Sequence, residues 1–379
     1  MTIATRTGPR LRLAVAAAGA ALLTACTADG GTGPEPAPAP ATFAPATPRA
    51  TRSTAAGPAG TPDLTAPETV ATGLTTPWGL AFLPDGSALV AQRDDGRILQ
   101  VRPGGDAPRQ VYRVPGVSAS GEGGLLGLAV ARDFAATGLV YAYFTANADN
   151  RIVRFKLGDA GPPQVIFDGI DKAGNHNGGR IAFGPDGMLY AGTGDAGNGS
   201  ASQDRGDSNG KILRLTPDGK PAPGNPFAGS PVWSLGHRNV QGLAWDATGT
   251  MYGIEFGQNR FDEVNLVQPG KNYGWPEVEG KGGDARFVEP IVTWRTTEAS
   301  PSGAAVAGRT LYVAALRGQR LWTVPLDGGQ PKAELSGRYG RLRTVAVAPD
   351  GALWLTTSNT DGRGDPKDGD DRILRFPAR

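Results

Sequence analysis

Residues 80–91, LAFLPDGSALVA, carry the pattern that decides the fold: an apolar strand, an Asp-Gly turn and a second apolar strand. Variants of this pattern recur every 41 to 62 residues, with starts at Leu80, Leu128, Ile181, Leu243, Ala304 and Val345. Asp-Gly and Thr-Gly turns favour hairpins, because such tight turns need positive φ angles. Each copy is followed by one more strand pattern, RILQV at 97, RIVRFKL at 151, KILRL at 211, EVNLV at 263, RLWTV at 320 and RILRF at 372.

Six small antiparallel sheets with this period predict an all-β fold, a six-bladed β-propeller of four-stranded blades. Residues 68–71 resemble a strand but have no blade before them, and the last repeat lacks an outer strand. We therefore expect the N-terminal strand to close the last blade, because closure removes an open sheet edge. The alternative is a sandwich of twelve or more strands, which does not explain the regular spacing.

Composition narrows the functional classes. The 57 glycines and 32 prolines make up almost a quarter of the 379 residues, which argues against a helical bundle. The net charge of +2 gives no reason to expect a nucleic-acid partner. A single cysteine excludes an intramolecular disulfide, a cysteine zinc site and an iron–sulfur cluster. Chemistry that needs an imidazole must use His176 or His237, the only two histidines.

The N-terminus reads as a targeting signal followed by a tether. Three arginines precede an apolar run at residues 13–23, which is too short to span a bilayer. The run ends in Leu23-Thr24-Ala25-Cys26, which resembles a bacterial lipobox. We expect residues 1–25 to be a lipoprotein signal peptide and Cys26 to be lipidated; an ordinary signal peptide with an incidental cysteine is the alternative.

The stretch that follows Cys26 is too polar and too rich in proline to fold. Residues 27–66 hold eight prolines and only two large apolar residues. We expect residues 26–66 to form a disordered tether and residues 67–379 to form the propeller. The protein would then lie outside the cytoplasm, anchored to the bacterial cell membrane by lipid.

Polar motifs interrupt the repeats in the loops, where propellers place functional residues. His176 lies in GNHNGGR, residues 174–180, and an accessible imidazole suits a general base at neutral pH. Asp195 ends the next strand pair and can orient that imidazole. Both residues also fit simple turns.

Other loops offer groups for an anion or a cation. Arg238 and Asn239 follow His237, which we expect to be structural. Arg341 and Arg343, two residues apart at a strand start, point to one face. Together with Arg317 they would repel one another unless a polycarboxylate ligand bound, although isolated solvated arginines need no ligand. The stretches EFGQN at 255–259 and FDE at 261–263 suit a hard cation or a plain polar turn.

Taken in order, the loop and strand motifs resemble those of the soluble quinoprotein sugar dehydrogenases. These are glucose and aldose sugar dehydrogenases that use pyrroloquinoline quinone (PQQ), and the resemblance covers essentially the whole domain. The motifs are GEGGLLGLA from 121, NHNGGRIAFGPDG from 175, GKILRLTPDG from 210, LGHRNVQGLAW from 235, DEVNLV from 262, NYGWP from 272 and RLRTVAVAPDG from 341. The short segment after NYGWP is similar to that of the shorter aldose sugar dehydrogenases.

The resemblance implies a function and roles for individual residues. An aldose would be oxidised at C1 to its lactone, with hydride transfer to PQQ and release of electrons to an external acceptor. His176 would be the catalytic base and Asp195 its supporting carboxylate. The carbonyl oxygens of Gly257 and Gln258 match the ligands of a calcium ion (Ca2+) that polarises PQQ. The residues placed around the cofactor are Glu122, Asn175, Arg238, Asn239, Asp262, Arg317, Arg341 and Arg343.

The chain departs from the family pattern at several of these positions. Glu122 replaces a glutamine, and its carboxylate would face a trianionic cofactor unless it turns away, pairs with an arginine or belongs to a shifted alignment. Arg317 replaces a lysine, Asn175 an aspartate, Val240 a proline and Phe256 a glutamine. We expect these differences to affect the choice of sugar and, to a lesser degree, the affinity for PQQ, and to leave the fold unchanged.

Two other functions stay open. A non-catalytic propeller lipoprotein that binds a sugar or a protein would be expected to lose the base or the arginines. A calcium-dependent lactonase would need clustered Asp, Glu and Asn around an axial metal in place of an arginine-lined pocket.

Overall fold

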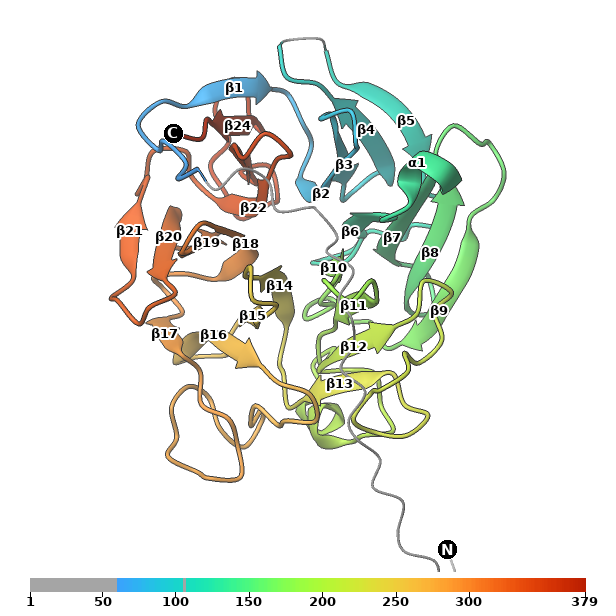
Figure 1. Cartoon of the computed structure of the whole chain (residues 1–379), viewed down its shortest axis with the longest axis vertical. Helices are drawn as coiled ribbons and strands as arrows, with labels where there is room; N and C mark the ends of the chain where they lie inside the picture. The colour runs from blue at the N-terminus through green and yellow to red at the C-terminus, as the bar shows by residue number, and fades with distance from the viewer. Residues whose placement is uncertain (1–59, 105–106) are drawn as a thin grey trace, which may run out of the picture. The chain divides into compact units, whose positions relative to one another are not determined.

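The computed structural model describes residues 60–104 and 107–379, so the predicted signal peptide, Cys26 and most of the predicted tether lie outside it. The described residues form six four-stranded antiparallel sheets arranged in a ring (Figure 1). Their only helices are α1 (Phe134–Thr137) and the short 3-10 helix η1 (Gly199–Gln203). The predicted all-β, six-bladed propeller is therefore confirmed.

The strands follow one another outward from the centre of the ring in each of the first five blades. Blade 1 is β2 (Pro77–Phe82), β3 (Ala88–Gln92), β4 (Arg97–Val101) and β5 (Arg109–Arg113); blade 2 is β6 (Leu125–Val130), β7 (Leu139–Thr145), β8 (Asn150–Lys156) and β9 (Gln164–Ile170); blade 3 is β10 (Ile181–Phe183), β11 (Leu189–Gly192), β12 (Lys211–Leu215) and β13 (Val232–Leu235). Blade 4 is β14 (Val240–Trp245), β15 (Met251–Glu255), β16 (Phe261–Val267) and β17 (Val292–Arg295); blade 5 is β18 (Pro301–Ala307), β19 (Thr310–Ala315), β20 (Arg320–Pro325) and β21 (Lys332–Glu334).

Blade 6 is assembled from both ends of the described chain. It consists of β22 (Leu342–Val347), β23 (Leu353–Thr357), β24 (Ile373–Phe376) and, outermost, β1 (Glu68–Ala71). The prediction that the N-terminal strand closes the last blade is thus confirmed. Pairing also starts before residue 67, the boundary expected from composition, because Asp63 N–H donates to the carbonyl of Pro377.

The six repeat starts all fall in the innermost strands, which surround the centre of the ring in Figure 1. Second strands such as β3 and β23 are buried along their whole length. Their residues are apolar on both faces because each blade packs face to face against its two neighbours. This packing explains why the repeats read as nearly continuous apolar runs.

Loops from all the blades meet at the end of the ring where the inner strands begin and the second strands finish. In five blades the pairing register of these two strands shifts near the first residues of the inner strand. Both hollows described below lie among these loops. None of the described segments forms a helix long and apolar enough to cross a membrane.

Candidate active site

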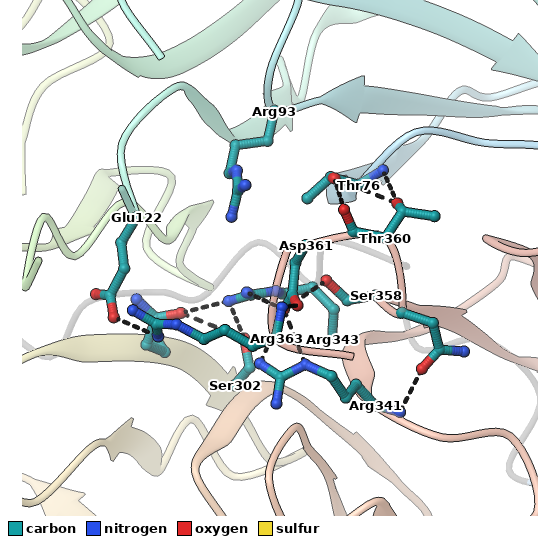
Figure 2. Close-up of polar contacts among 12 residues, drawn as sticks. Thr76, Arg93, Glu122, Ser302, Arg341, Arg343, Ser358, Thr360, Asp361 and Arg363 are labelled. Atoms are coloured by element: carbon teal, nitrogen blue, oxygen red, sulfur yellow. Dashed lines mark hydrogen bonds and ion pairs between the residues drawn. The ribbon is translucent and has the colours of Figure 1, made fainter. Parts of the chain in front are cut away.

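A cavity of about 390 Å³ lies at this end of the ring, and we call it the arginine cavity. Its walls are Trp78, Arg93, Gly121, Glu122, Gln241, Phe256, Ser300, Leu316, Arg317, Arg341, Arg343, Asp361 and Arg363. Five arginines and two carboxylates give these walls a formal net charge of +3. Figure 2 shows Arg93 and Arg363 approaching this space from separate loops, and Arg341 and Arg343 approaching it from the start of β22. The cavity therefore has the charge expected of a site for a multivalent anion.

Arg341 and Arg343 point to the same side of their strand, as expected, and both meet Asp361. Arg341 Nε and Nη2 lie 2.9 and 2.8 Å from Asp361 Oδ2, and Arg343 Nη2 lies 3.8 Å away. Burial alone would raise the pKa of Asp361, but the two arginines outweigh it and lower that pKa. Burial lowers the pKa of Arg343 to about 9, so its guanidinium stays charged at neutral pH. The single carboxylate of Asp361 thus offsets only part of the charge of the two buried arginines.

A second, wider hollow of about 810 Å³ adjoins the arginine cavity, and we call it the open hollow. It is lined by Asn175, His176, Asp195, Gly197, Gly199, Ser200, Arg238, Gln258, Asn259, Trp275 and Pro276. The two hollows share a wall. Glu122 lines the cavity and accepts the backbone N–H of His176 at 3.0 Å, while Phe256 lines the cavity and its carbonyl accepts from Arg238 at 3.3 Å.

His176 and Asp195 form a hydrogen-bonded pair in the open hollow. The His176 Nδ1 to Asp195 Oδ1 distance is 2.7 Å. Burial would raise the pKa of Asp195, but bonds from His176, Gly197 and Trp275 lower it. An ionised Asp195 accepts a proton-bearing Nδ1, which leaves the lone pair of the imidazole on Nε2. The pair therefore has the geometry of a base and the carboxylate that orients it.

Arg238 connects the two hollows. Its Nη1 donates to the carbonyl of Gly257 at 2.7 Å, and its guanidinium lies 5.3 Å from the centre of the Trp275 ring. Its backbone N–H donates to Glu255, whose other oxygen meets Nδ1 of His237 at 2.8 Å. His237 is fully buried, which fits the structural role expected for it.

Several buried donors near these hollows have no partner among the described residues. They are Arg238 Nε, Asn239 Nδ2 and Arg343 Nε. A buried donor without an acceptor is costly, typically by about 1–3 kcal/mol. These atoms indicate that the site is built for an acceptor-rich ligand.

Asp262 braces loops rather than lining either hollow. Its Oδ1 accepts Gly257 N–H at 2.9 Å and its Oδ2 accepts Ser300 N–H at 2.7 Å. Burial raises the pKa of Asp262 to about 6. Asp262 therefore supports the loop that carries Gly257, and the cofactor contact expected for it stays a prediction.

The loop at 257–261 is also held by a residue that sequence reasoning missed. Glu279 Oε1 accepts the backbone N–H groups of Gln258, Asn259, Arg260 and Phe261 at 2.6 to 3.1 Å. No cluster of three or more His, Cys, Asp or Glu side chains able to hold a metal occurs in the described part of the chain. A cation at this loop would therefore rely on backbone carbonyls such as those of Gly257 and Gln258.

The structure brings most of the expected site residues together. Glu122, Arg317, Arg341 and Arg343 line the arginine cavity, and Asn175, His176, Asp195, Arg238 and Gln258 line the open hollow. Sequence reasoning missed Arg93, Asp361, Arg363 and Trp275. Arg93 directly follows β3, the second strand of blade 1. Phe256 directly follows β15 and Arg317 lies two residues after β19, the second strands of blades 4 and 5. Comparing this position across the repeats would have identified Arg93.

The match to known proteins covers all of the ring except its outermost strand β1 and the last residues of β24. Residues 74–374 match the family model described as Glucose / Sorbosone dehydrogenase. The chain belongs to this family of sugar oxidoreductases. The family resemblance expected from the motifs is therefore confirmed.

Three relatives of this sugar dehydrogenase are informative. A PQQ-bound structure of the aldose sugar dehydrogenase from Streptomyces coelicolor is 56% identical, with a TM-score of 0.81, and the match covers 86% of this chain and 100% of that chain. The aldose sugar dehydrogenase YliI of Escherichia coli is 29% identical over 334 residues, 76% of this chain and 89% of that protein. Quinoprotein glucose dehydrogenase B of Acinetobacter calcoaceticus is 31% identical over 253 residues, 57% of this chain and 53% of that protein.

Proposed function

We propose that this sugar dehydrogenase oxidises an aldose at C1 to the lactone, with PQQ and calcium as cofactors and His176 as general base. The observation that carries the proposal is the shared wall between the His176–Asp195 pair and a cavity of net charge +3. With His176 as the base, a proton acceptor would lie beside a site for a multivalent anion. The PQQ-bound relative from Streptomyces coelicolor supports the choice of anion.

The arginine cavity fits PQQ in charge and in hydrogen-bonding groups. PQQ is trianionic, which matches the +3 of the cavity walls. Arg343 Nε in this cavity has no partner among the described residues, and neither have Arg238 Nε and Asn239 Nδ2 in the adjoining loop; all three would find acceptors on the carboxylate and quinone oxygens of PQQ. The flat walls offered by Trp78 and Phe256 suit an aromatic ring system. PQQ, when bound there, supplies the two-electron acceptor for the hydride that leaves C1.

His176 performs the proton transfer in this proposal. Its Nε2 takes the proton of the C1 hydroxyl while C1 gives up a hydride. The C1–O single bond thereby becomes the carbonyl of the lactone. Asp195 holds the imidazole through Nδ1 and stabilises the imidazolium that forms. The guanidinium groups of Arg238 and Arg343 would stabilise the negative charge of the cofactor close to this base.

Calcium would bind at the carbonyl oxygens of Gly257 and Gln258, and both are the hard oxygen ligands that this ion prefers. Asp262 and Glu279 accept the N–H groups of this loop and so help to fix its carbonyls. The Gly257 carbonyl already accepts a hydrogen bond from Arg238. Calcium at this oxygen would bring a second cation close to the Arg238 guanidinium, and the carboxylates of the anionic cofactor would balance this charge.

Reconstitution of the full chain tests the proposal. Cofactor-free protein is mixed with calcium and PQQ, and dye reduction is followed with a panel of aldoses, with His176→Ala as the comparison. We expect sugar-dependent reduction that requires PQQ and falls by at least about 100-fold in the variant. Folded protein that binds no PQQ would contradict the proposal and favour a non-catalytic binding role.

We also propose that the protein acts outside the cytoplasm, held at the bacterial membrane through lipid on Cys26. The support is the lipobox-like Leu23-Thr24-Ala25-Cys26 after a short apolar run. We expect Cys26→Ser to move the protein from the membrane fraction to the soluble extracytoplasmic fraction. An unchanged membrane fraction in that variant would contradict lipidation at Cys26.

A further inference from the structure

The loop that carries the base is held in an unusual backbone conformation. His176 has φ of 55°, in the left-handed region that residues with a Cβ atom adopt only when their surroundings enforce it. Its backbone carbonyl accepts the N–H of Ala196 at 3.2 Å, and its backbone N–H donates to Glu122 Oε2 at 3.0 Å. Both polar groups of the strained peptide are therefore fixed by partners from outside the loop.

Glu122 holds this loop at two points. Besides accepting the N–H of His176, it donates its own backbone N–H to the carbonyl of Gly174 at 2.9 Å. The approach is close enough that a Cβ atom on Gly121, whose φ is 57°, would collide with the same carbonyl. Glu122 thus belongs to a tight contact between the loop before β6 and the loop before β10.

The charge of Glu122 is balanced from the other side of the cavity. Arg363, in the loop between β23 and β24 of blade 6, places its Nη1 2.9 Å from Glu122 Oε1 (Figure 2). Burial would raise the pKa of Glu122, but the His176 N–H and Arg363 outweigh it, so this pKa is lowered. A glutamine in this place would turn its amide NH2 toward Arg363 or toward His176 N–H, and neither contact is favourable. Glu122 and Arg363 are therefore matched to each other.

We infer that Glu122 is a positioning residue for the catalytic base: its carboxylate fixes the left-handed peptide of His176, and Arg363 holds that carboxylate in place. This inference rests on the proposed role of His176. It assigns to Glu122 a function that acts through the loop, in place of the direct cofactor contact expected from the sequence. The departure from glutamine then has a physical reason, because Arg363 supplies the countercharge.

A charge swap distinguishes positioning of the His176 peptide from a purely structural ion pair between Glu122 and Arg363. The double variant Glu122→Arg/Arg363→Glu restores an ion pair but leaves His176 N–H without an acceptor. We expect kcat to fall at least about tenfold in Glu122→Ala and to stay equally low in the swap, while Arg363→Met loses about threefold. Recovery of kcat in the swap would overturn the inference. Glu298→Ala is the matched control, because Glu298 accepts the N–H of Arg295 at 3.0 Å on an exposed turn.

Hydrogen exchange of the cofactor-free protein tests the inference without turnover. The His176 amide should exchange at least about tenfold faster in Glu122→Ala and in the swap than in the wild type. PQQ affinity, measured by titration, should not fall in Glu122→Ala, because the variant removes a negative charge from the wall of a cavity that would hold an anion. Unchanged exchange at His176 would overturn the inference. Wild-type protein that neither binds PQQ nor oxidises a sugar would instead contradict the proposed function and leave the exchange result standing.

Discussion

Trp275 donates its indole N–H to Asp195 Oδ2 at 2.8 Å, the carboxylate oxygen that His176 does not use. The face of the same indole ring lies beneath the guanidinium of Arg238. One side chain therefore contacts both the group that orients the base and an arginine next to the cavity. This contact was not foreseen, although the motif NYGWP that contains Trp275 was recognised.

Trp275→Phe should lower kcat by about tenfold, because it removes one donor to an ionised carboxylate while it keeps an aromatic ring against Arg238. Steady-state kinetics of the PQQ-loaded protein measure this change. Trp233→Phe is the matched control, since the indole N–H of Trp233 has no partner among the described residues. Equal losses in both variants would show that the bond to Asp195 has no special role.

Arg343→Met should weaken PQQ binding by about 10- to 100-fold and raise the melting temperature of the cofactor-free protein by about 2 °C or more. The reason is that Arg343 is a buried cation with an unpartnered Nε, held beside other arginines. Fluorescence titration and thermal unfolding without cofactor give the two readouts. A lower melting temperature with unchanged PQQ affinity would mean that Arg343 is structural.

Asp361→Asn should destabilise the cofactor-free protein by about 2 kcal/mol near neutral pH. The pKa of Asp361 is lowered in the folded state, so its contribution is complete above the ordinary value of 3.8 and is lost as the pH falls through the lower folded value. The gap between wild type and variant should therefore narrow in acid. Denaturant unfolding at neutral and progressively acidic pH measures the gap, and a gap independent of pH would refute this account.

Glu279→Ala should raise the calcium concentration needed for half-maximal PQQ-dependent activity by about tenfold, because four N–H groups of the loop at 258–261 lose their common acceptor. A calcium titration of the reconstituted protein provides the measurement. Glu289→Ala serves as control, since Glu289 accepts one N–H, that of Gly283, on an exposed turn. The same calcium requirement in wild type and Glu279→Ala would exclude this role.

The fold could be predicted from the sequence because each blade repeats one local signal. Buried strands such as β3 are apolar on both faces, and the turns after inner strands are marked by residues such as Asp85 and Gly86. Closure by β1 followed from the missing outer strand of the last repeat. These features depend on neighbours in the chain or on simple counting.

The site was harder to predict because its contacts join residues from distant blades. Glu122 and Arg363 are 241 positions apart, and only the closed ring brings them together. His176 and Asp195, 19 positions apart within one repeat, were paired correctly from the sequence. Arg363 and Asp361 lie in a loop with no repeat-based signal, so nothing in the pattern separated them from other surface charges.

Blade 6 carries a consequence for how the chain is made. Its outermost strand comes from residues 68–71, whereas its other three strands come from residues 342–376. During synthesis β1 leaves the ribosome early and has no partner until β24 follows. The ring therefore cannot close before β24 has been made, and the residues that blade 6 contributes to the arginine cavity, Arg341 and Arg343 among them, are the last of its lining to be synthesised. Assembly of the cavity accordingly depends on pairing between strands from opposite ends of the described chain.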